Sequence, residues 1–148
     1  MNWLEVLIVS AMPFSELRGG IPLAIYLGLP PMEAFLLAIL GNLLPIPFLL
    51  MFLEKIDRIV IRWEPLARIY LKVVERIERK KIIVERYGYL GLLMFVAIPL
   101  PMTGAWSGSL LAFLLRLNKT KSLIFITIGV LIAGILVLSA SLGVVSIF

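Results

Sequence analysis

Three long stretches of the sequence contain no charged residue, and they constrain the fold more than any other feature. They run from Phe35 to Leu53, from Tyr87 to Leu115 and from Ser122 to Phe148. A helix that crosses the apolar core of a bilayer needs about 20 apolar residues, and each stretch is about that long or longer. Apolar residues make up 61% of the whole chain, against roughly 45–50% in a soluble domain. We therefore expect an all-α integral membrane protein.

The basic residues are segregated, and their positions predict how the chain is oriented. Most of the 14 Lys and Arg lie between Glu54 and Arg86, and three more form the link at 116–121. Basic links face the cytoplasm, so residues 54–86 and 116–121 are expected to be cytoplasmic. The C-terminus is then expected outside, in a protein that crosses the cytoplasmic membrane more than once. The acidic link LGLPPME, between the first two apolar segments, is expected to face outward.

The stretch at 87–115 lies between the two basic regions, so it must leave the cytoplasm and return to it. We expect it to form a re-entrant hairpin of two short helices. Pro99, Pro101 and Gly104 fall at its centre, where a turn needs residues that interrupt a helix or adopt unusual backbone angles. Such irregular backbone is tolerated inside a membrane where protein or a wet cavity surrounds it. The alternative, a spanning helix, places the basic link at 116–121 outside, against the charge rule.

The first segment, Trp3 to Leu29, is apolar but carries polar and flexible residues near its middle: Glu16, Arg18, Gly19 and Gly20. This pattern predicts a second broken hairpin. No Lys or Arg precedes Arg18, so the segment lacks the basic start of a signal peptide. We expect it to belong to the mature protein.

An internal repeat relates the two broken segments. Placing Pro13 on Pro101 also aligns four further pairs, which are Gly20 with Gly108, Ala24 with Ala112, Leu29 with Leu117 and Gly41 with Gly129. We call this the repeat alignment. Both copies then follow one order, in which a broken hairpin precedes a loop and a spanning helix.

The first hairpin is expected to open outward and the second inward, so the two copies are predicted to be inverted repeats. Many secondary transporters use this plan, with discontinuous helices that meet near the middle of the membrane. Residues 1–53 form the first repeat, 54–86 the cytoplasmic connection and 87–148 the second repeat of a single membrane domain, 1–148. A chance coincidence of Pro and Gly positions is the alternative.

The connection at 54–86 has the pattern of amphipathic helices that lie on a membrane surface. Apolar residues recur at steps of three and four, basic residues occupy the other face, and Pro65 is expected to break the segment in two. Contact with anionic lipid headgroups is the functional interpretation, and a solvated helix face is the alternative. Since the bases alternate with acids and an apolar stripe, we do not expect nucleic acid as a partner.

Glu16 and Arg18 are the residues most expensive to place in a membrane. A central charge is unfavourable by roughly 2.5–3.5 kcal/mol on insertion scales, so partners, water or function must offset it. Glu16 is expected at the start of a half-helix, where free N–H groups favour an anion, and it is a candidate proton or cation site. Arg18 is a candidate clamp for an anionic group. In the alternative interpretation the turn lies shallow, Arg18 reaches the interface and both residues are hydrated.

The second turn, PLPMTGAWSGS, has no charge. Thr103 is a candidate cap for the following half-helix, whose N–H groups attract anions, and Trp106 a candidate pocket wall. Alternatively, Trp106 packs, and Gly104 with Gly108 makes a small-residue helix contact. Asn42, which lies near Pro45 and Pro47, either stabilises a kink or lines a polar site.

The chain has no His and no Cys, so zinc sites and imidazole-based triads are excluded, and we expect neither a metal nor a cofactor. An intramembrane enzyme would have to use Ser107 or Ser109 without a nearby base. We therefore do not expect an enzyme.

The strings PFSELRGGIPLAIYLG and RYGYLGLLMFVAIPLPMTGAWSGSLLA, together with the intervening Asn42, resemble the signature of the putative small multidrug export protein family. That family is similar in plan to the DedA-like, or VTT, membrane proteins, which are implicated in moving lipid phosphates. The resemblance implies a membrane transporter. Relative to the DedA-like pattern, the second hairpin lacks an arginine and has Thr103, Gly104 and Trp106 in that place.

These features predict a secondary transporter that exports small molecules, coupled to protons through Glu16. The alternative is a DedA-like translocator that uses Arg18 to bind lipid phosphates or other anionic lipids. A non-transporting assembly subunit is a third interpretation. Two repeats with few membrane crossings surround a substrate pathway only thinly, so we expect a homodimer. Membrane lipids and the substrate are the other expected partners.

Overall fold

The computed structural model describes residues 2–12, 16–98 and 104–147, and within these ranges the chain is helical and contains no strand. In chain order the helices are α1 (Asn2–Ala11), α2 (Glu16–Tyr26), α3 (Pro31–Leu43), α4 (Ile46–Ile61), α5 (Glu64–Glu78), α6 (Lys81–Tyr87), α7 (Tyr89–Ala97), α8 (Ala105–Leu114) and α9 (Lys119–Ile147). The expected all-α class is confirmed.

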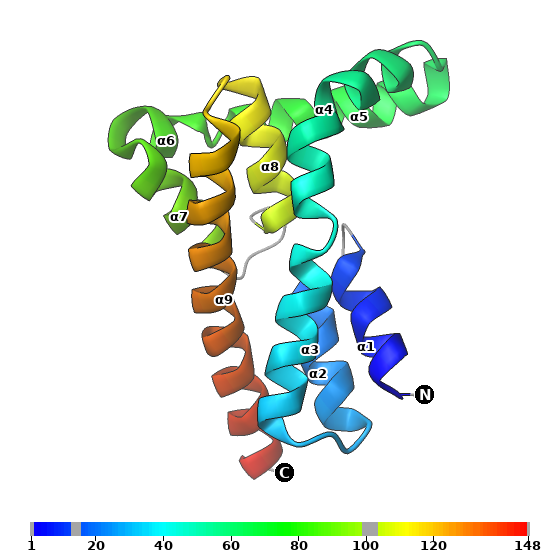
Figure 1. Cartoon of the computed structure of the whole chain (residues 1–148), viewed down its shortest axis with the longest axis vertical. Helices are drawn as coiled ribbons and strands as arrows, with labels where there is room; N and C mark the ends of the chain where they lie inside the picture. The colour runs from blue at the N-terminus through cyan, green and yellow to red at the C-terminus, as the bar shows by residue number, and fades with distance from the viewer. Residues whose placement is uncertain (1, 13–15, 99–103, 148) are drawn as a thin grey trace.

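Among the described residues, two helical stretches are long and apolar enough to cross a membrane. They are Pro31–Ile61, which comprises α3 and α4, and Lys119–Gly143 in α9, with mean hydropathies of 2.3 and 2.8. The first extends beyond the expected Phe35–Leu53 at both ends. Both run along the long dimension of the molecule, where α9 contacts α3 and α4 (Figure 1).

The break between α3 and α4 falls at Leu44 and Pro45, within the kink that the sequence predicts. Pro45 is the N-cap of α4, and Pro47 lies in its first turn. Proline has no N–H group, so it fits best in the first turn of a helix, where that group would make no intrahelical hydrogen bond. The two prolines therefore end α3 and restart the chain as α4.

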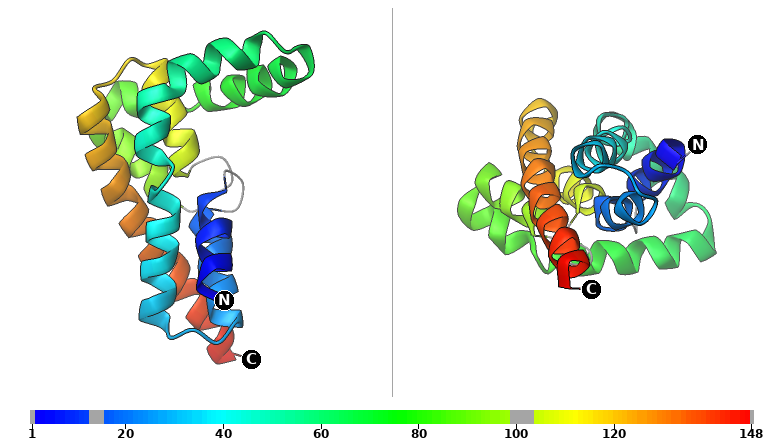
Figure 2. Two further views of the ribbon diagram at one scale, coloured as in Figure 1. Left: turned by 45° about the vertical axis from the view of Figure 1, so that its right-hand side comes forward. Right: turned by 90° about the horizontal axis from the view of Figure 1, so that it is seen from below.

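The helices pack in two groups of three. In the first, which we call unit 1, α1, α2 and α3 contact one another, and in unit 2 the same holds for α7, α8 and α9. The pair α1–α2 lies beside the lower half of α9 and the pair α7–α8 beside its upper half (Figures 1 and 2). The two units also contact each other, since α2 and α3 of unit 1 both contact α9 of unit 2, and α8 of unit 2 packs on α4, which continues α3.

The ends of α2 and α8 have the same hydrogen-bond pattern. The bonds are Gly28 N to Ile25 O and Leu29 N to Ala24 O in α2, and Arg116 N to Phe113 O and Leu117 N to Ala112 O in α8, all between 2.9 and 3.1 Å. This is the Schellman motif, which places one residue in the left-handed region. That residue is Gly28, with a φ of 87°, or Arg116, with a φ of 55°. The four bonds obey the repeat alignment.

Equivalent glycines hold the helices of each unit close together. A Cβ added at Gly41 of α3 would lie 2.6 Å from the carbonyl oxygen of Leu7 in α1. A Cβ at Gly129 of α9 would lie 2.9 Å from the carbonyl oxygen of Leu93 in α7. Only glycine permits such backbone approach, which is typical of helix contacts in membranes.

A second pair of glycines lets the second helix of each unit approach the first. They are Gly20 in α2 and Gly108 in α8. Gly20 faces Ser10 of α1, and Gly108 faces Val96 of α7. Ser10 also lies against Gly41, just as Val96 lies against Gly129. In both units, therefore, one side chain of the first helix sits between two glycines.

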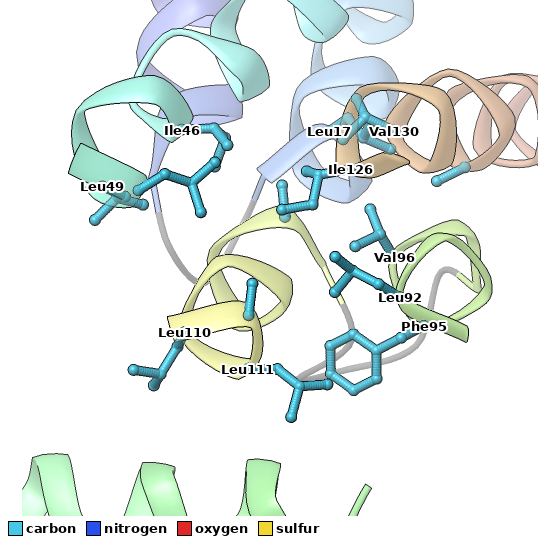
Figure 3. Close-up of a cluster of buried hydrophobic side chains, with 14 of the residues drawn as sticks. Leu17, Ile46, Leu49, Leu92, Phe95, Val96, Leu110, Leu111, Ile126 and Val130 are labelled. Carbon is cyan, nitrogen blue, oxygen red and sulfur yellow. The ribbon is translucent and has the colours of Figure 1, made fainter. Parts of the chain in front are cut away.

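The main apolar core is shared by both units and by α4. Its buried members include Leu17 and Ile46 from the first half of the chain and Leu92, Phe95, Leu111 and Ile126 from the second (Figure 3). The outward faces of the long helices are apolar too; large exposed side chains there are Leu36, Leu40, Leu44, Phe48, Met51, Ile124, Ile128 and Ile135. A surface of this kind suits a lipid environment.

The connection between the units is helical, as expected, but its breaks differ from the prediction. Helix α4 continues to Ile61, the first break lies at Arg62 and Trp63, and Pro65 is in the first turn of α5. A second break, at Arg79 and Lys80, was not predicted. Figure 1 shows the end of α4 and α5 extending sideways from the helical body.

Helix α5 is attached to its neighbours by a polar and an apolar contact. The Tyr70 hydroxyl donates a 2.5 Å hydrogen bond to Asp57 Oδ1 of α4, and Ile77 is buried in the main core. Burial, followed by this hydrogen bond and the Asp57 charge, raises the pKa of the Tyr70 hydroxyl above its ordinary value of 10.0. The ion pairs along this segment are exposed and contribute little.

Candidate functional site

Glu16 occupies the position that the sequence predicts, at the start of the half-helix α2. Its side chain is buried, with only 3% of the residue exposed. Its φ of 48° lies in the left-handed region, which is uncommon for residues other than glycine, and such strain often accompanies function. The backbone N–H of Glu16 donates a 3.0 Å bond to the carbonyl of Met12, which connects α2 back to the end of α1.

The Glu16 carboxylate lies at the start of the other half-helix, α8. The backbone N–H of Trp106 donates a 3.0 Å hydrogen bond to Glu16 Oε1. The N-cap residue of α8 is Gly104, which has no side chain to cap the helix, and a Cβ added there would overlap the carboxylate. Glu16 therefore does for α8 what an N-cap side chain does within a single helix.

Trp106 makes a second bond across the same boundary. Its indole Nε1–H donates a 3.0 Å hydrogen bond to the carbonyl oxygen of Ala11, the last residue of α1. We call the group of Ala11, Glu16, Gly104 and Trp106 the Glu16 junction. Through it, one residue of unit 2 binds both the end of α1 and the start of α2.

Electrostatics favour a negative charge at the Glu16 junction. The first N–H groups of a helix carry partial positive charge, and a carboxylate there is stabilised by charge-assisted hydrogen bonds. Protonation or binding of a cation would weaken the bond between Glu16 and Trp106. Chemically, then, the junction is an acidic group whose charge state sets how tightly the two units are joined.

The other predicted residues lie around this junction or outside the described part of the chain. Arg18 has its backbone in the first turn of α2, and its side chain lies outside what the structure describes. Gly19 is half-buried beside it, and Gly20 is buried against Ser10. The three remaining turn residues, Pro99, Pro101 and Thr103, lie outside the described residues.

Asn42 is buried in α3, with 2% of its surface exposed, and its Oδ1 has no hydrogen-bond partner among the described residues. Ser10 of α1 has the same property, and sequence reasoning missed it because a lone serine in an apolar helix forms no motif. The feature that marks Ser10 is its place between Gly20 and Gly41, and this feature appears only in the packed structure.

No group of three or more Asp and Glu that could hold a metal occurs in the described part of the chain. The candidate nucleophile Ser109 donates its hydroxyl to the Ala105 carbonyl of its own helix at 2.7 Å. Such back-bonding is a common structural use of serine in membrane helices.

Comparison with known proteins gives one match. The family model described as putative small multi-drug export protein matches residues 16–136, a range that includes Glu16, Asn42 and Trp106. No curated protein and no solved structure matches the chain. The export family and the two long apolar helices in the described part of the chain together indicate a membrane protein with a role in export. The match covers most of the sequence, and the chain therefore belongs to the putative small multi-drug export protein family.

Proposed function

We propose that this protein is a secondary transporter that exports small cationic molecules, with Glu16 as the group that binds the cargo or the coupling proton. The observation that carries the proposal is the buried Glu16 carboxylate, which accepts a hydrogen bond from Trp106 on the opposite unit. Intramembrane ionisable residues usually face a transport pathway. In this protein such a residue also joins the two units that transport has to separate.

Inverted repeats are part of the proposal, with units 1 and 2 as the two copies and α1–α2 and α7–α8 as re-entrant hairpins. Three observations support it. The Schellman motifs of α2 and α8 obey the repeat alignment, the glycine contacts of the two units correspond, and the second helix of each unit packs on the long helical stretch from the other half of the chain, α2 on α9 and α8 on α4.

The contact between Glu16 and Gly104 supports the same arrangement. These two residues correspond to each other in the repeat alignment, and the Glu16 carboxylate lies against Gly104. In a structure with two-fold pseudosymmetry, corresponding residues touch only near the axis. Glu16 would then lie at the centre of the transporter, where binding sites of inverted-repeat transporters occur.

The proposed cycle alternates between two states of the Glu16 carboxylate. When it is ionised and empty, it caps α8 and the units are joined. Binding of a proton or a cationic group neutralises the carboxylate, weakens the bond to Trp106 and lets the units rock apart. The charged residues on the helices packed around α2 are Glu5 of α1, Glu33 of α3, and Lys119 and Lys121 of α9, all exposed, and Arg18 lies two residues further along α2.

A DedA-like translocator of lipid phosphates is the second candidate, and one observation weighs against it. Such a protein would bind its anion at a half-helix N-terminus. At α8, Glu16 occupies this position, and a second anion would be repelled.

Transport by the full chain in proteoliposomes tests the proposal, with ethidium as a cationic probe and an imposed pH gradient. We expect Glu16→Gln to reduce transport at least tenfold, because Gln neither ionises nor binds a proton. The matched control is Glu33→Gln, an exposed acid of unit 1, which is expected to leave transport unchanged. Loss of transport with Arg18→Gln but not with Glu16→Gln would overturn the proposal in favour of an anionic cargo.

Single cysteines test the proposed topology, since the chain has none of its own. Introduced at Lys80 and Lys119, they are expected to react with an impermeant reagent from the cytoplasmic side. At Leu29 and Ser146 they are expected to react from the outer side. Labelling of Lys80 and Lys119 from opposite sides would show that the stretch between them crosses the membrane once.

A further inference from the structure

Unit 1 contains two deeply buried oxygen atoms without a partner among the described residues. They are Ser10 Oγ, in a residue with 0% exposure, and Asn42 Oδ1. Buried polar atoms are nearly always hydrogen-bonded, so each exception needs an explanation. A third such atom, Ser122 Oγ, lies in the first turn of α9 next to the exposed Lys121. Ser122 is also 0% exposed, but it lies at the start of α9 in unit 2, whereas the other two residues lie in unit 1.

Ser10 and Asn42 lie at one level of the molecule. Ser10 packs on Gly41, the residue that precedes Asn42 in α3. Ala11, which follows Ser10, accepts the indole hydrogen bond of Trp106. Ser10 therefore adjoins the Glu16 junction along α1, and Asn42 directly follows the residue that Ser10 contacts in α3, within the same three-helix group as Glu16.

Unit 2 shows that the packing itself needs no polar atom at either place. Val96 takes the place of Ser10 between two glycines, and Val130 corresponds to Asn42 in the repeat alignment. Both valines are buried. Since the same helix contacts form around valine, the oxygens of unit 1 serve a purpose other than folding.

We propose that Ser10 Oγ and Asn42 Oδ1 accept hydrogen bonds from the N–H groups of a protonated amine whose positive charge Glu16 balances. The proposal rests on the proposed function, because it takes the cargo to be cationic. Asn42 Oδ1 can only accept a hydrogen bond and Ser10 Oγ can accept one, so the two atoms suit a ligand that carries donors, and the Glu16 carboxylate of the same unit selects a positive charge over a negative one. An ammonium group with N–H bonds satisfies both conditions, and a quaternary ammonium satisfies only the second.

Two probes of equal charge test this selection. Benzylammonium carries N–H donors and benzyltrimethylammonium carries none. Binding of either to the purified full chain raises its midpoint of thermal unfolding, and at equal ligand concentration the rise is larger for the probe with the lower Kd. We expect the wild type to bind benzylammonium at least tenfold more tightly than benzyltrimethylammonium. In Ser10→Ala and Asn42→Val, each with the apolar character of unit 2, this preference is expected to disappear.

The stability of the unliganded variants separates binding from structure. Since each substitution removes an unpaired buried oxygen, the unfolding midpoint without ligand is expected to stay the same or rise. Ser109→Ala is the control, because it removes a buried hydroxyl that has a partner, and it is expected to retain the preference for benzylammonium.

Three results would overturn the inference. In the first, the wild type binds the two probes equally tightly and Glu16→Gln binds neither. That result overturns the role of Ser10 and Asn42 but leaves the proposed function intact. The second is an unchanged preference in both Ser10→Ala and Asn42→Val. The third is a wild type stabilised by neither probe, which counts against a cationic cargo as well.

Discussion

Units 1 and 2 are built alike but carry different chemistry. Both end their second helix in a Schellman motif and both use two glycines to pack their first helix. Unit 1, however, has polar residues at three central positions, namely Ser10, Glu16 and Asn42, where unit 2 has Val96, Gly104 and Val130. The difference separates residues required for packing from residues free to serve function.

The Glu16 junction shows why the two units must differ. If unit 2 had a side chain at Gly104, it would collide with the Glu16 carboxylate. A second carboxylate there would also repel the first, since two adjacent like charges disfavour ionisation of both. One unit therefore supplies the charge and the other supplies the space and the N–H group of Trp106.

The largest predicted effect concerns the packing that both units share. We expect Gly41→Ala and Gly129→Ala to destabilise the protein by similar amounts, about 1–3 kcal/mol each, because the added methyl group overlaps a backbone carbonyl. Thermal unfolding of the purified variants measures this. Gly143→Ala is the control, since a Cβ there meets nothing within 4 Å. A large loss of stability for one glycine alone would show that the units are not packed alike.

The next effect concerns the bond that joins the units. Trp106→Phe retains an aromatic ring and the backbone N–H but loses the indole bond to Ala11. We expect a loss of about 0.5–1.5 kcal/mol, the typical contribution of one hydrogen bond. Trp3→Phe, at an exposed position of α1, is expected to have no measurable effect. An equal loss of stability in the two variants, measured by thermal unfolding, would show that the indole bond of Trp106 does not stabilise the junction.

A smaller effect tests the one place where unit 2 is strained and unit 1 is not. Arg116 has the left-handed conformation that Gly28 adopts in unit 1. Left-handed backbone is unfavourable by roughly 1–2 kcal/mol for a residue with a Cβ, so we expect Arg116→Gly to stabilise the protein by up to about 1 kcal/mol. The opposite exchange, Gly28→Arg, should destabilise it. A stability change of the same sign in both variants would contradict the equivalence of these positions.

The smallest predicted effect concerns the stability of α5, in the connection between the units, at high pH. The pKa of Tyr70 is raised in the folded protein, so its bond to Asp57 stabilises the docking of α5 fully below pH 10. This contribution is lost as the pH rises above 10 and the hydroxyl ionises. Amide hydrogen exchange is base-catalysed and accelerates with pH in both proteins, so the exchange of α5 is compared with that intrinsic rise. Above pH 10 we expect an additional accelerating step in the wild type and no such step in Tyr70→Phe. A step of equal size in the variant would rule out Tyr70 as its source.

The helices and their breaks could be predicted from the sequence because they depend on local chemistry. The apolar stretches define α3, α4 and α9, and Pro45 and Pro65 mark breaks because proline lacks a donor. The break at Arg79 and Lys80 has no such residue. It was missed because packing of the flanking Ile77 and Val84 into the core determines it.

The candidate site could be predicted only in part. Glu16 stood out because a charge inside an apolar segment is costly, and its place at the start of α2 follows from the preference of helix starts for anions. Its partner Trp106 could not be predicted, because their hydrogen bond joins residues that are 90 positions apart in the sequence. Ser10 was missed for the same reason, since the glycines around it come from two other helices.

A cross-link between positions 16 and 104 tests most directly the central claim that the two units meet at Glu16 and Gly104. In the cysteine-free chain, the pair Glu16→Cys and Gly104→Cys is expected to form a disulfide under mild oxidation in the native membrane, leaving no titratable thiol. The control pair, Glu16→Cys with Gly108→Cys, lies one helical turn and about 6 Å further along α8 and should keep both thiols. Two free thiols in the first pair, or equal cross-linking of both pairs, would contradict the account.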